Sequence, residues 1–511
     1  AIPDINIDKE TRQKLLEQLE VPIMNPFINK SSEWTITERL KFIFGLFTLV
    51  PIRICLMIII LGTIGILSKI GLIGVSDEDL KQPPTKGRKF LLKLFSFLAR
   101  VLLFVMGVYW VSVKGKPDKR ATIIVPNHVS FLDPIFMFWA AHPHFVAKSG
   151  VAEIPFLGSM FRFIQPILVD RLSPTSRSDT SDEINRRAHW KGDTSWNATC
   201  LFPEGTCTNG TSLIAFKYGA FKPGAPVQPV VIRYPFVNFD VSLVNGISGG
   251  MLILRTLCQF VVYMEVEFLP LYTPSEKEKE NAALYAQNVR SEMAAALNCP
   301  TTEHTYEDVL LQIEAMKRSV PAKKMVLTKS IKSQFADLSY DDLKFQLKEF
   351  SQMDTTGNGN LSLEQFRTAL GLPDSHYVTD LFNLLDVSEK GSIDFREYIA
   401  GKALISKVLT TDETIRMAFT SFDVNQDGVI ELHELMNVMK YGFPDISDSD
   451  VAELFNTIDR TDKDKVNFDE FSSHIKKHPE YLSLFLAYKK ESAAKTLSEE
   501  SKKDIQLQCA D

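Results

Sequence analysis

The chain has 511 residues, with 57 Lys and Arg against 63 Asp and Glu, a formal net charge of −6, and 45% hydrophobic residues. This length suggests about three domains, and the lack of a basic excess argues against a protein that binds nucleic acid. Six cysteines without a CxxC pair indicate neither a disulfide scaffold nor a thiolate metal site.

Residues 42–67 are strongly apolar, and Arg53 is their single charge. At about 1.5 Å per residue, a helix of this length is longer than the roughly 30 Å of bilayer hydrocarbon, which predicts a membrane span. Pro51 and Arg53 favour a bent, re-entrant hairpin instead, because proline breaks the hydrogen-bond ladder of a helix and an arginine in mid-bilayer is costly. Both topologies stay open, alongside a buried helix of a soluble core.

A second apolar stretch covers residues 90–113. Lys93, Ser96 and Arg100 are spaced to form one polar stripe opposite Phe, Leu and Val, which predicts a helix lying on the membrane surface. A basic cluster precedes it and could contact lipid phosphates, or it could simply be a solvated turn.

From about residue 120, short β-rich runs alternate with helix-like segments, which indicates an α/β sheet domain. The first run, ATIIVP, leads directly into NHVSFLDP, so His128 and Asp133 follow the carboxyl end of a strand, where open α/β sheets bind ligands. An Asp that bonds one imidazole nitrogen leaves the other to act as a general base toward an alcohol. Because His128 and Asp133 are five residues apart, the chain must curl to bring them together. Such a pair alone is weak evidence for a catalytic site.

A second run, ATCLFP, leads into EGTCTNG and places Glu204, Gly205 and Thr206 at the end of another strand. A glycine there allows close backbone approach, and its exposed N–H groups suit a phosphate or an oxyanion, although an ordinary turn has the same residues. Between the two clusters lie three arginines that could bind phosphates of a substrate or of coenzyme A, or could be surface charges. They are Arg162, Arg171 and Arg177.

Residues 335–480 form a repeat of amphipathic helices and acidic loops that open at Asp354, Asp386, Asp423 and Asp459, 32, 37 and 36 residues apart. A twelve-residue calcium loop needs oxygen ligands at positions 1, 3, 5 and 7, Gly at 6 and a bidentate Glu at 12. The third loop meets all of these demands, and its predicted ligands are Asp423, Asn425, Asp427, the Val429 carbonyl and Glu434, with the turn at Gly428.

The other three loops depart from this pattern. The second is predicted to bind calcium weakly, because Lys390 stands at position 5; its ligand positions are Asp386, Ser388, Lys390, Ser392 and Glu397. The first ends in Gln365 and the fourth has Asp464 in place of the glycine, so we expect both to be structural partners of their neighbours. A scaffold with one metal site and no regulatory role fits the same pattern.

Taken together, NHVSFLDP, GSMFR, FPEGT and PVQPVVIRYP resemble, in this order, the four blocks of the glycerolipid acyltransferase superfamily. With apolar segments upstream and calcium loops downstream, the chain resembles the lysophosphatidylcholine acyltransferases that contain EF-hands, as do NPF at Asn25 and HTYED at His304. The resemblance implies that His128 is the general base, that Asp133 is its partner, and that residues 204–206 serve the acyl acceptor. Arg162 matches the second block only loosely.

The expected fold is an α/β acyltransferase domain, a mixed sheet flanked by helices, with N-terminal membrane-embedded helices and a C-terminal all-α EF-hand domain. The expected boundaries are an arm at 1–40, membrane helices at 41–115, the acyltransferase domain at 116–315, a linker at 316–335, four EF-hand loops within 336–490, and a tail at 491–511. The resemblance implies a protein of the endoplasmic reticulum membrane, with the Golgi and lipid droplets as further sites.

The resemblance further implies transfer of an acyl group from acyl-CoA, as co-substrate, to the sn-2 hydroxyl of a lysophospholipid in the bilayer, with lysophosphatidylcholine as the expected acceptor and lyso-PAF acetylation as a possible extension. Calcium is expected at the EF-hand loops. The alternatives are an acyltransferase for lysophosphatidic acid or glycerol 3-phosphate, and an inactive membrane-tethered calcium sensor. The sequence leaves open the acyl-chain preference, calcium regulation, the membrane side of the site and the oligomeric state.

Overall fold

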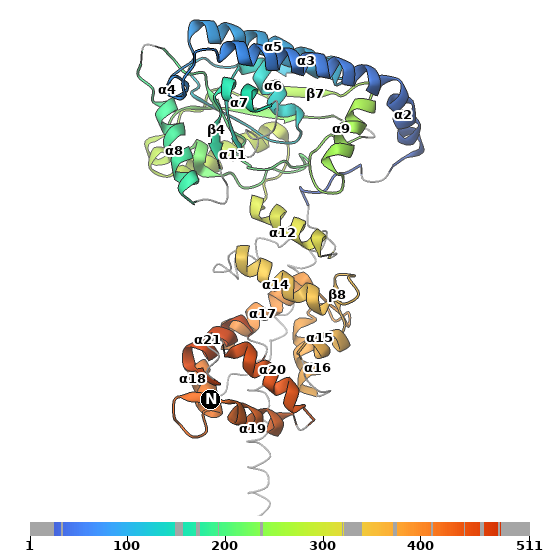
Figure 1. Ribbon diagram of the computed structural model, residues 1–511, viewed down its shortest axis with the longest axis vertical. Coiled ribbons are helices and arrows are strands. Elements are labelled where there is room, and N and C mark those ends of the chain that lie inside the picture. The colour runs from blue at the N-terminus through green and yellow to red at the C-terminus, as the bar shows by residue number, and fades with distance from the viewer. Residues whose placement is uncertain are drawn as a thin grey trace, which may run out of the picture. The chain divides into compact units, whose positions relative to one another are not determined.

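The computed structural model describes residues 25–31, 34–148, 157–169, 174–192, 194–235, 239–318, 320, 340–370, 376–409, 412–443, 445–459, 464–478 and 481. The described residues fall into two compact units, one ending at Tyr306 and one starting at Glu307. The first contains an α/β sheet and the second is mainly helical, as expected from the sequence (Figure 1).

A seven-stranded mixed sheet forms the centre of the first unit, with strand order β1-β7-β6-β2-β5-β3-β4. The strands β6, β2, β5, β3 and β4 are mutually parallel, whereas β7 is antiparallel to β6 and parallel to β1. The bounds are β1 Val111–Lys114, β2 Ile123–Pro126, β3 His144–Lys148, β4 Ile167–Val169, β5 Thr199–Cys200, β6 Val227–Arg233 and β7 Met264–Phe268. The carboxyl ends of the five parallel strands therefore share one edge of the sheet.

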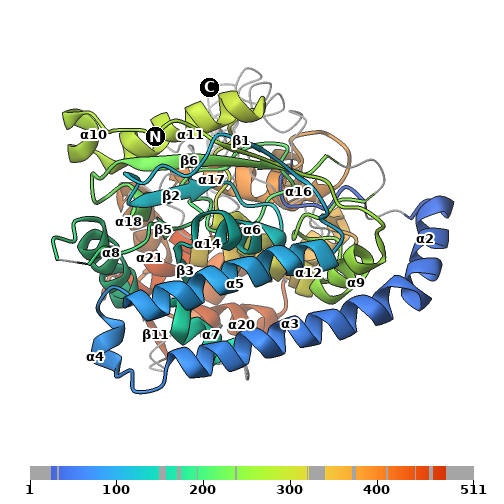
Figure 2. The ribbon, with the colours of Figure 1, turned by 90° about the horizontal axis from the view of Figure 1, so that it is seen from above.

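Helices cover both faces of this sheet. Their bounds are α2 Ile36–Phe47, α3 Leu49–Gly71, α4 Asp77–Leu80, α5 Lys86–Val105, α6 Leu132–Ala141, α7 Leu157–Ile164, α8 Pro174–Ala188, α9 Gly249–Cys258, α10 Glu276–Glu280 and α11 Ala282–Leu297. In β2, Ile124 joins the core shared with α3, α5, α6 and α9, while Ile123 and Val125 join the core shared with α8 and α11. Figure 2 shows α11 on one side of the sheet and α5 with α3 on the other.

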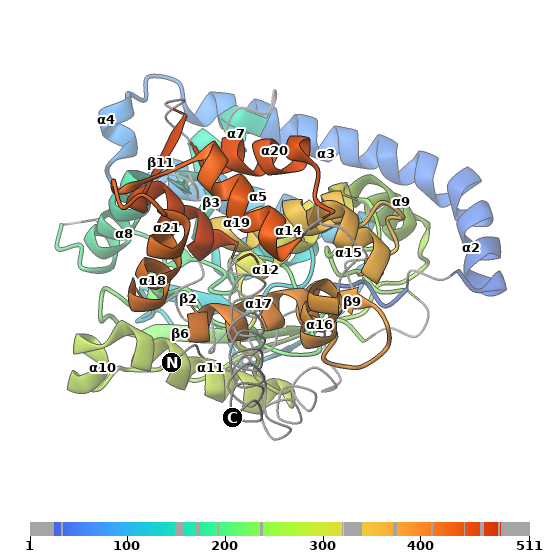
Figure 3. The same cartoon turned by 90° about the horizontal axis from the view of Figure 1, so that it is seen from below.

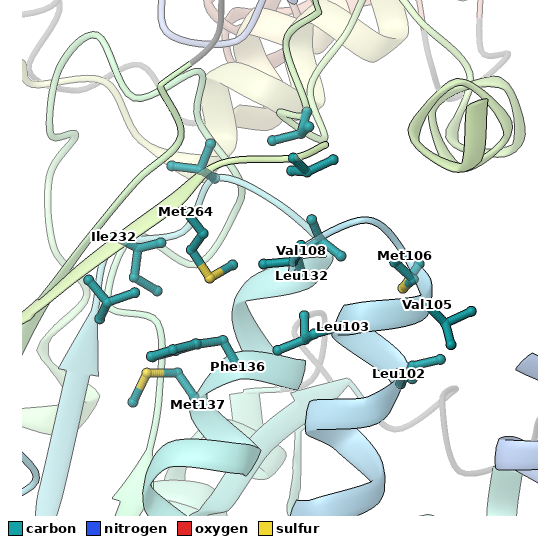
Figure 4. Packing of buried hydrophobic residues seen from close by; sticks show 14 of the residues in the cluster. Leu102, Leu103, Val105, Met106, Val108, Leu132, Phe136, Met137, Ile232 and Met264 are labelled. Atoms are coloured by element: carbon teal, nitrogen blue, oxygen red, sulfur yellow. The ribbon is translucent and has the colours of Figure 1, made fainter. Parts of the chain in front are cut away.

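The core beneath α5 and α6 fixes the position of α6, whose first turn follows the end of β2. Leu103 and Val108 pack there with Leu132 and Phe136 of α6, and Ile232 and Met264 contribute from β6 and β7 (Figure 4). All six side chains are almost completely buried. Such close packing leaves little room for α6 to shift relative to the sheet.

The first apolar stretch begins in the last turns of α2 and continues as one long helix, α3, so the bend at Pro51 that the hairpin alternative requires is not found there. The chain turns at Thr48, between α2 and α3, so Pro51 lies in the first turn of α3, where its missing N–H has no helical partner to lose. By length and composition, Ile36–Gly71 could cross a membrane. Both ends of α3 lie against the first unit, however, with Arg53 at the end of α9 and Gly71 against Phe163 of α7.

Arg53 is buried because its guanidinium reaches backbone carbonyls. It donates to the carbonyls of Leu257 and Gln259, at 2.8 and 2.7 Å, and to the Tyr109 hydroxyl at 3.0 Å. These carbonyls lie at the carboxyl end of α9, the negative end of the helix dipole, so the cation is stabilised there without a carboxylate.

We therefore expect Arg53→Met to lower the free energy of unfolding by about 3 kcal/mol, because hydrogen bonds to a charged group contribute about 1.5–3 kcal/mol and two carbonyls would lose their donor. The thermal unfolding midpoint of the detergent-solubilised protein measures this. Arg39→Met, at an exposed position of α2, is the matched control. Equal midpoints for the two variants would contradict this account of α3 docking.

The second apolar stretch differs from the sequence prediction in two ways. Helix α5 ends at Val105, and Val111–Lys114 form strand β1. Two of the three residues of the polar stripe face protein, whereas Lys93 is exposed. Ser96 donates to the Trp139 carbonyl at 2.9 Å, and Arg100 donates to the carbonyls of Val108 and Tyr109. Large apolar side chains of α5 remain exposed, and they add to exposed apolar residues on α2 and α3; among them are Phe44, Phe47, Ile52, Ile58, Ile59, Ile66, Phe90, Phe97 and Phe104.

The second unit contains the four predicted loops and the helices around them (Figure 3). The bounds are α12 Tyr306–Lys317, α14 Tyr340–Met353, β8 Asn360–Leu361, α15 Leu363–Leu370, α16 His376–Leu385, β9 Ile393–Asp394, α17 Phe395–Leu409, α18 Asp412–Phe422, β10 Val429–Glu431, α19 Leu432–Gly442, α20 Asp448–Ile458, β11 Lys465–Asn467 and α21 Phe468–Lys477. Antiparallel pairing joins β8 to β9 and β10 to β11, so the loops are coupled as two pairs.

Candidate active site and calcium loops

The turn after β2 brings His128 and Asp133 together. One Asp133 carboxylate oxygen accepts the backbone N–H groups of Val129 and Ser130, at 2.7 and 2.8 Å, which curls the chain back over the start of α6. The same oxygen lies 2.9 Å from Nδ1 of His128. Asp133 is completely buried, whereas the His128 side chain is 20% exposed. This arrangement orients the imidazole and leaves its second nitrogen for a proton.

Tyr234, which the sequence reasoning did not select, holds the other Asp133 oxygen. Tyr234 follows β6 directly, and its hydroxyl donates to that oxygen at 2.5 Å. The carboxyl end of β6 lies beside that of β2, so the rule that pointed to His128 also pointed here. With both oxygens bonded, the carboxylate is fixed in one orientation.

The loop after β5 closes on the same turn. The buried Glu204 carboxylate accepts the His128 backbone N–H at 2.8 Å, and the Thr208 N–H donates to the His128 carbonyl at 2.8 Å. Gly205 has a φ of 71°, and a Cβ there would lie 3.0 Å from Lys217. Thr206 is half-buried in the same turn. The buried Glu204 carboxylate therefore holds the backbone of the turn that carries His128, and its role in substrate binding stays a prediction.

The surroundings of His128 and Glu204 shift their ionisation. Burial opposes the charged form of the His128 ring, but the Cys207 sulfur and the Asp133 carboxylate outweigh it and raise the pKa of His128 above its ordinary value of 6.5. Burial raises the pKa of Glu204 to about 7. The His128 ring also stacks on Phe202, with centroids 4.0 Å apart. Cys207 and Phe202 flank the EGT motif, and no pattern in the sequence singled them out.

Of the three predicted arginines, the structure describes the side chain of Arg162. Arg162 is exposed on the last turn of α7 and pairs with Asp77 at 2.6 Å. Because α7 leads into the start of β4, Arg162 lies toward the amino ends of the parallel strands, opposite the edge that carries His128, and its role in phosphate binding stays a prediction. The backbone of Arg177 lies in α8. The Arg177 side chain and the whole of Arg171 lie outside the described residues.

In the third calcium loop, the predicted ligands satisfy the N–H groups of their own loop. Asp423 accepts from Asp427 and Gly428, at 3.0 and 2.9 Å, and Glu434 accepts from Val424 and Asn425. Gly428 has a φ of 86°, as the turn requires, and Val429 starts β10. The described residues contain no cluster of three His, Cys, Asp or Glu side chains placed to share a metal.

In the first two loops, the structure shows where the residues that depart from the calcium-loop pattern lie. In the second, Lys390 is exposed, its backbone N–H bonds to Asp386, and Glu397 accepts from Ser388; Ser392 is half-buried beside β9. In the first, the Gln365 amide donates to Thr355 at 3.1 Å, so its end closes on the loop itself. The donor set of the third loop, three carboxylates, one amide oxygen and a carbonyl, therefore fits calcium best.

Comparison with known proteins matches both units. The acyltransferase family model matches residues 111–233, and the model for an EF-hand domain pair matches residues 412–476. The first match spans the turn with His128, the loop with Glu204 and the end of β6. The second spans the third and fourth loops.

Several curated proteins are similar over most of the chain. Lysophosphatidylcholine acyltransferase 2 of Mus musculus is 37% identical, covering 91% of this chain and 86% of that protein, and its Danio rerio counterpart is 37% identical, covering 91% and 88%. Lysophosphatidylcholine acyltransferase 1 of Mus musculus is 34% identical, covering 92% and 88%. The crystal structure of the LPA acyltransferase PlsC from Thermotoga maritima has a TM-score of 0.34 at 18% identity, over 51% of this chain and 97% of that chain.

Proposed function

The chain belongs to the lysophosphatidylcholine acyltransferase family and is an O-acyltransferase, and we propose that it transfers an acyl group from acyl-CoA to the sn-2 hydroxyl of a lysophospholipid, with lysophosphatidylcholine as the preferred acceptor. The observation that carries this proposal is the His128–Asp133 pair, held by Tyr234 from a third strand end. We further propose the endoplasmic reticulum membrane as its location.

In the proposed mechanism, His128 takes the proton of the acceptor hydroxyl as the oxygen attacks the thioester carbon. Asp133 stabilises the resulting imidazolium through Nδ1. The tetrahedral intermediate collapses, the carbon–sulfur bond breaks, and coenzyme A leaves as a thiolate, which needs little help from an acid because its conjugate thiol is far more acidic than an alcohol. His128 then returns its proton to the thiolate or to solvent, so no covalent enzyme intermediate is needed.

Release of coenzyme A by the detergent-solubilised protein tests the proposal. The assay combines acyl-CoA with lysophosphatidylcholine, other lysophospholipids, lysophosphatidic acid or glycerol 3-phosphate, and includes acetyl-CoA as a donor. Selectivity for lysophosphatidylcholine would support the proposal, and selectivity for lysophosphatidic acid or glycerol 3-phosphate would replace the acceptor. Folded protein that binds calcium but transfers no acyl group would favour a sensor.

We propose that calcium binds the third loop through Asp423, Asn425, Asp427, the Val429 carbonyl and Glu434, and binds the second loop more weakly. Its chemistry there would be to neutralise the clustered carboxylates and to draw Glu434, at the start of α19, toward the loop. Calcium would not take part in acyl transfer in this scheme, since the catalytic residues come from the other unit.

Glu434→Gln should weaken calcium binding to the third loop, because position 12 supplies two of the ligand oxygens. The loss should be at least as large as the about 10- to 100-fold that follows when a residue bonded to a metal ligand is removed. Isothermal titration calorimetry of the full chain measures this. Gln365→Ala, at position 12 of the first loop, is the control and should leave the titration unchanged. Wild-type affinity in Glu434→Gln would place the calcium site elsewhere.

A further inference from the structure

A short N-terminal segment, Asn25–Ser31, lies against the two loops that surround the catalytic turn; we refer to it as the arm. Phe27 anchors it, being 1% exposed and in edge contact with His304 at 5.8 Å. The arm contains the NPF motif, and Phe27 packs on the histidine of the HTYED motif. Neither motif has a role in the reaction proposed above.

The first loop contacted by the arm is the one after β5. The Asn209 side-chain amide donates to the carbonyls of Asn25 and Ile28, at 3.1 and 2.9 Å, and its backbone N–H donates to the Pro26 carbonyl at 2.7 Å. The Asn209 oxygen accepts from Thr211, so every polar atom of this buried side chain is used. One residue thus ties the arm to the EGTCTNG loop.

The second loop contacted by the arm is residues 239–245, which follow β6. Ile28 forms a parallel bridge with Asn245, with hydrogen bonds of 2.8 and 3.0 Å. The Asn29 amide, 1% exposed, donates to the carbonyls of Asp240 and Ser242, at 3.1 and 3.0 Å. Because these groups are buried, water cannot readily replace the amide when it is removed.

Each of these loops in turn bonds one carbonyl of the catalytic turn. The Thr208 N–H, next to Asn209, donates to the His128 carbonyl at 2.8 Å, and the Leu243 N–H donates to the Val129 carbonyl at 2.9 Å. The two N–H groups therefore hold successive peptide units of the turn, and the arm joins the loops that carry them.

We propose that the arm positions His128 for catalysis, with Asn29 and Asn209 as positioning residues that act through the two loops. This inference rests on the proposed acyl transfer and adds a part of the chain remote in sequence from the four motif blocks. The fixed turn keeps the imidazole oriented toward the hydroxyl, and a displacement of about 1 Å at a reacting group can cost about 10²-fold in rate.

Asn209→Ala and Asn29→Ala test the proposal by steady-state kinetics of coenzyme A release. We expect kcat to fall about 10- to 100-fold while both KM values stay within about threefold of wild type. Gln228→Ala is the matched control: its buried amide also bridges two carbonyls, those of Lys116 and Leu269, but from inside β6. It should lower the unfolding midpoint and leave kcat unchanged.

Hydrogen exchange of the full chain gives a readout that does not need turnover. Both arm variants should speed exchange in peptides covering residues 127–133, 204–210 and 239–245, and the control should not. Wild-type kcat in both arm variants, wild-type exchange in these peptides, or an equal loss of kcat in Gln228→Ala would overturn the proposal. If Asn209→Ala does not fold, Asn29→Ala decides alone. A wild-type protein without acyl transfer would overturn the proposed function and the catalytic role of the arm together, while exchange would still show whether the arm orders the loops.

Discussion

His128→Ala should lower kcat by about 10²- to 10⁴-fold or more, because this is what a general base contributes, with little change in either KM. The reason is that the His128 ring is held by the buried Asp133 carboxylate and is partly exposed at this edge of the sheet. The measurement is coenzyme A release with acyl-CoA and lysophosphatidylcholine, together with circular dichroism to show that the variant is folded.

The control for this prediction is His189→Ala, which removes an exposed histidine at the end of α8 and should leave turnover unchanged. If folded His128→Ala turns over within about twofold of wild type, His128 is not the base. A loss confined to KM would assign His128 to substrate binding instead.

The second large effect is expected for Asp133→Asn, which should lower kcat by about 10³-fold because an amide cannot stabilise the imidazolium and favours the wrong tautomer. Asp133 also accepts the N–H groups of Val129 and Ser130, so thermal unfolding must accompany the kinetics. Tyr234→Phe removes only one bond to the carboxylate and should cost about 10-fold, which gives a graded comparison.

The pH dependence separates these variants from a general loss of structure. His128 acts as a base only when neutral, and its pKa is raised above 6.5, so activity should rise with pH through an apparent pKa above that value. In Asp133→Asn the carboxylate no longer favours the charged ring, and the acid limb of kcat/KM should move to lower pH. An acid limb at the same pH in both proteins would show that another group is titrating.

Much of the site could be read from the sequence because it depends on strand ends. Runs such as ATIIVP and ATCLFP identify buried parallel strands, and the polar residues directly after them share an edge of the sheet. The strand-end rule therefore predicts from the sequence alone that His128, Asp133 and Glu204 lie near one another. It cannot show that Glu204 turns inward to the His128 N–H, because the direction of a side chain in a loop depends on the loops packed around it.

The features that the sequence did not reveal have a common physical origin in tertiary contacts. Ser96 and Arg100 form a polar stripe that looks solvated, yet α6 and the turn before β1 supply their partners. Arg53 looks unfavourable in an apolar helix until the end of α9 supplies carbonyls. Arg162 lies close in sequence to the motif blocks but at the opposite edge of the sheet, because α7 leads back to the start of β4.

The exposed apolar surface of α2, α3 and α5 has a consequence for how the enzyme would be kinetically controlled. Helix α5 packs on α6, whose first turn carries Asp133, so the active site is one helix layer away from the surface that suits lipid. An acceptor reaching the site from that surface would diffuse in two dimensions. The rate would then depend on the mole fraction of lysophospholipid in the bilayer rather than on its bulk concentration, and added inert phospholipid would slow the reaction by dilution alone.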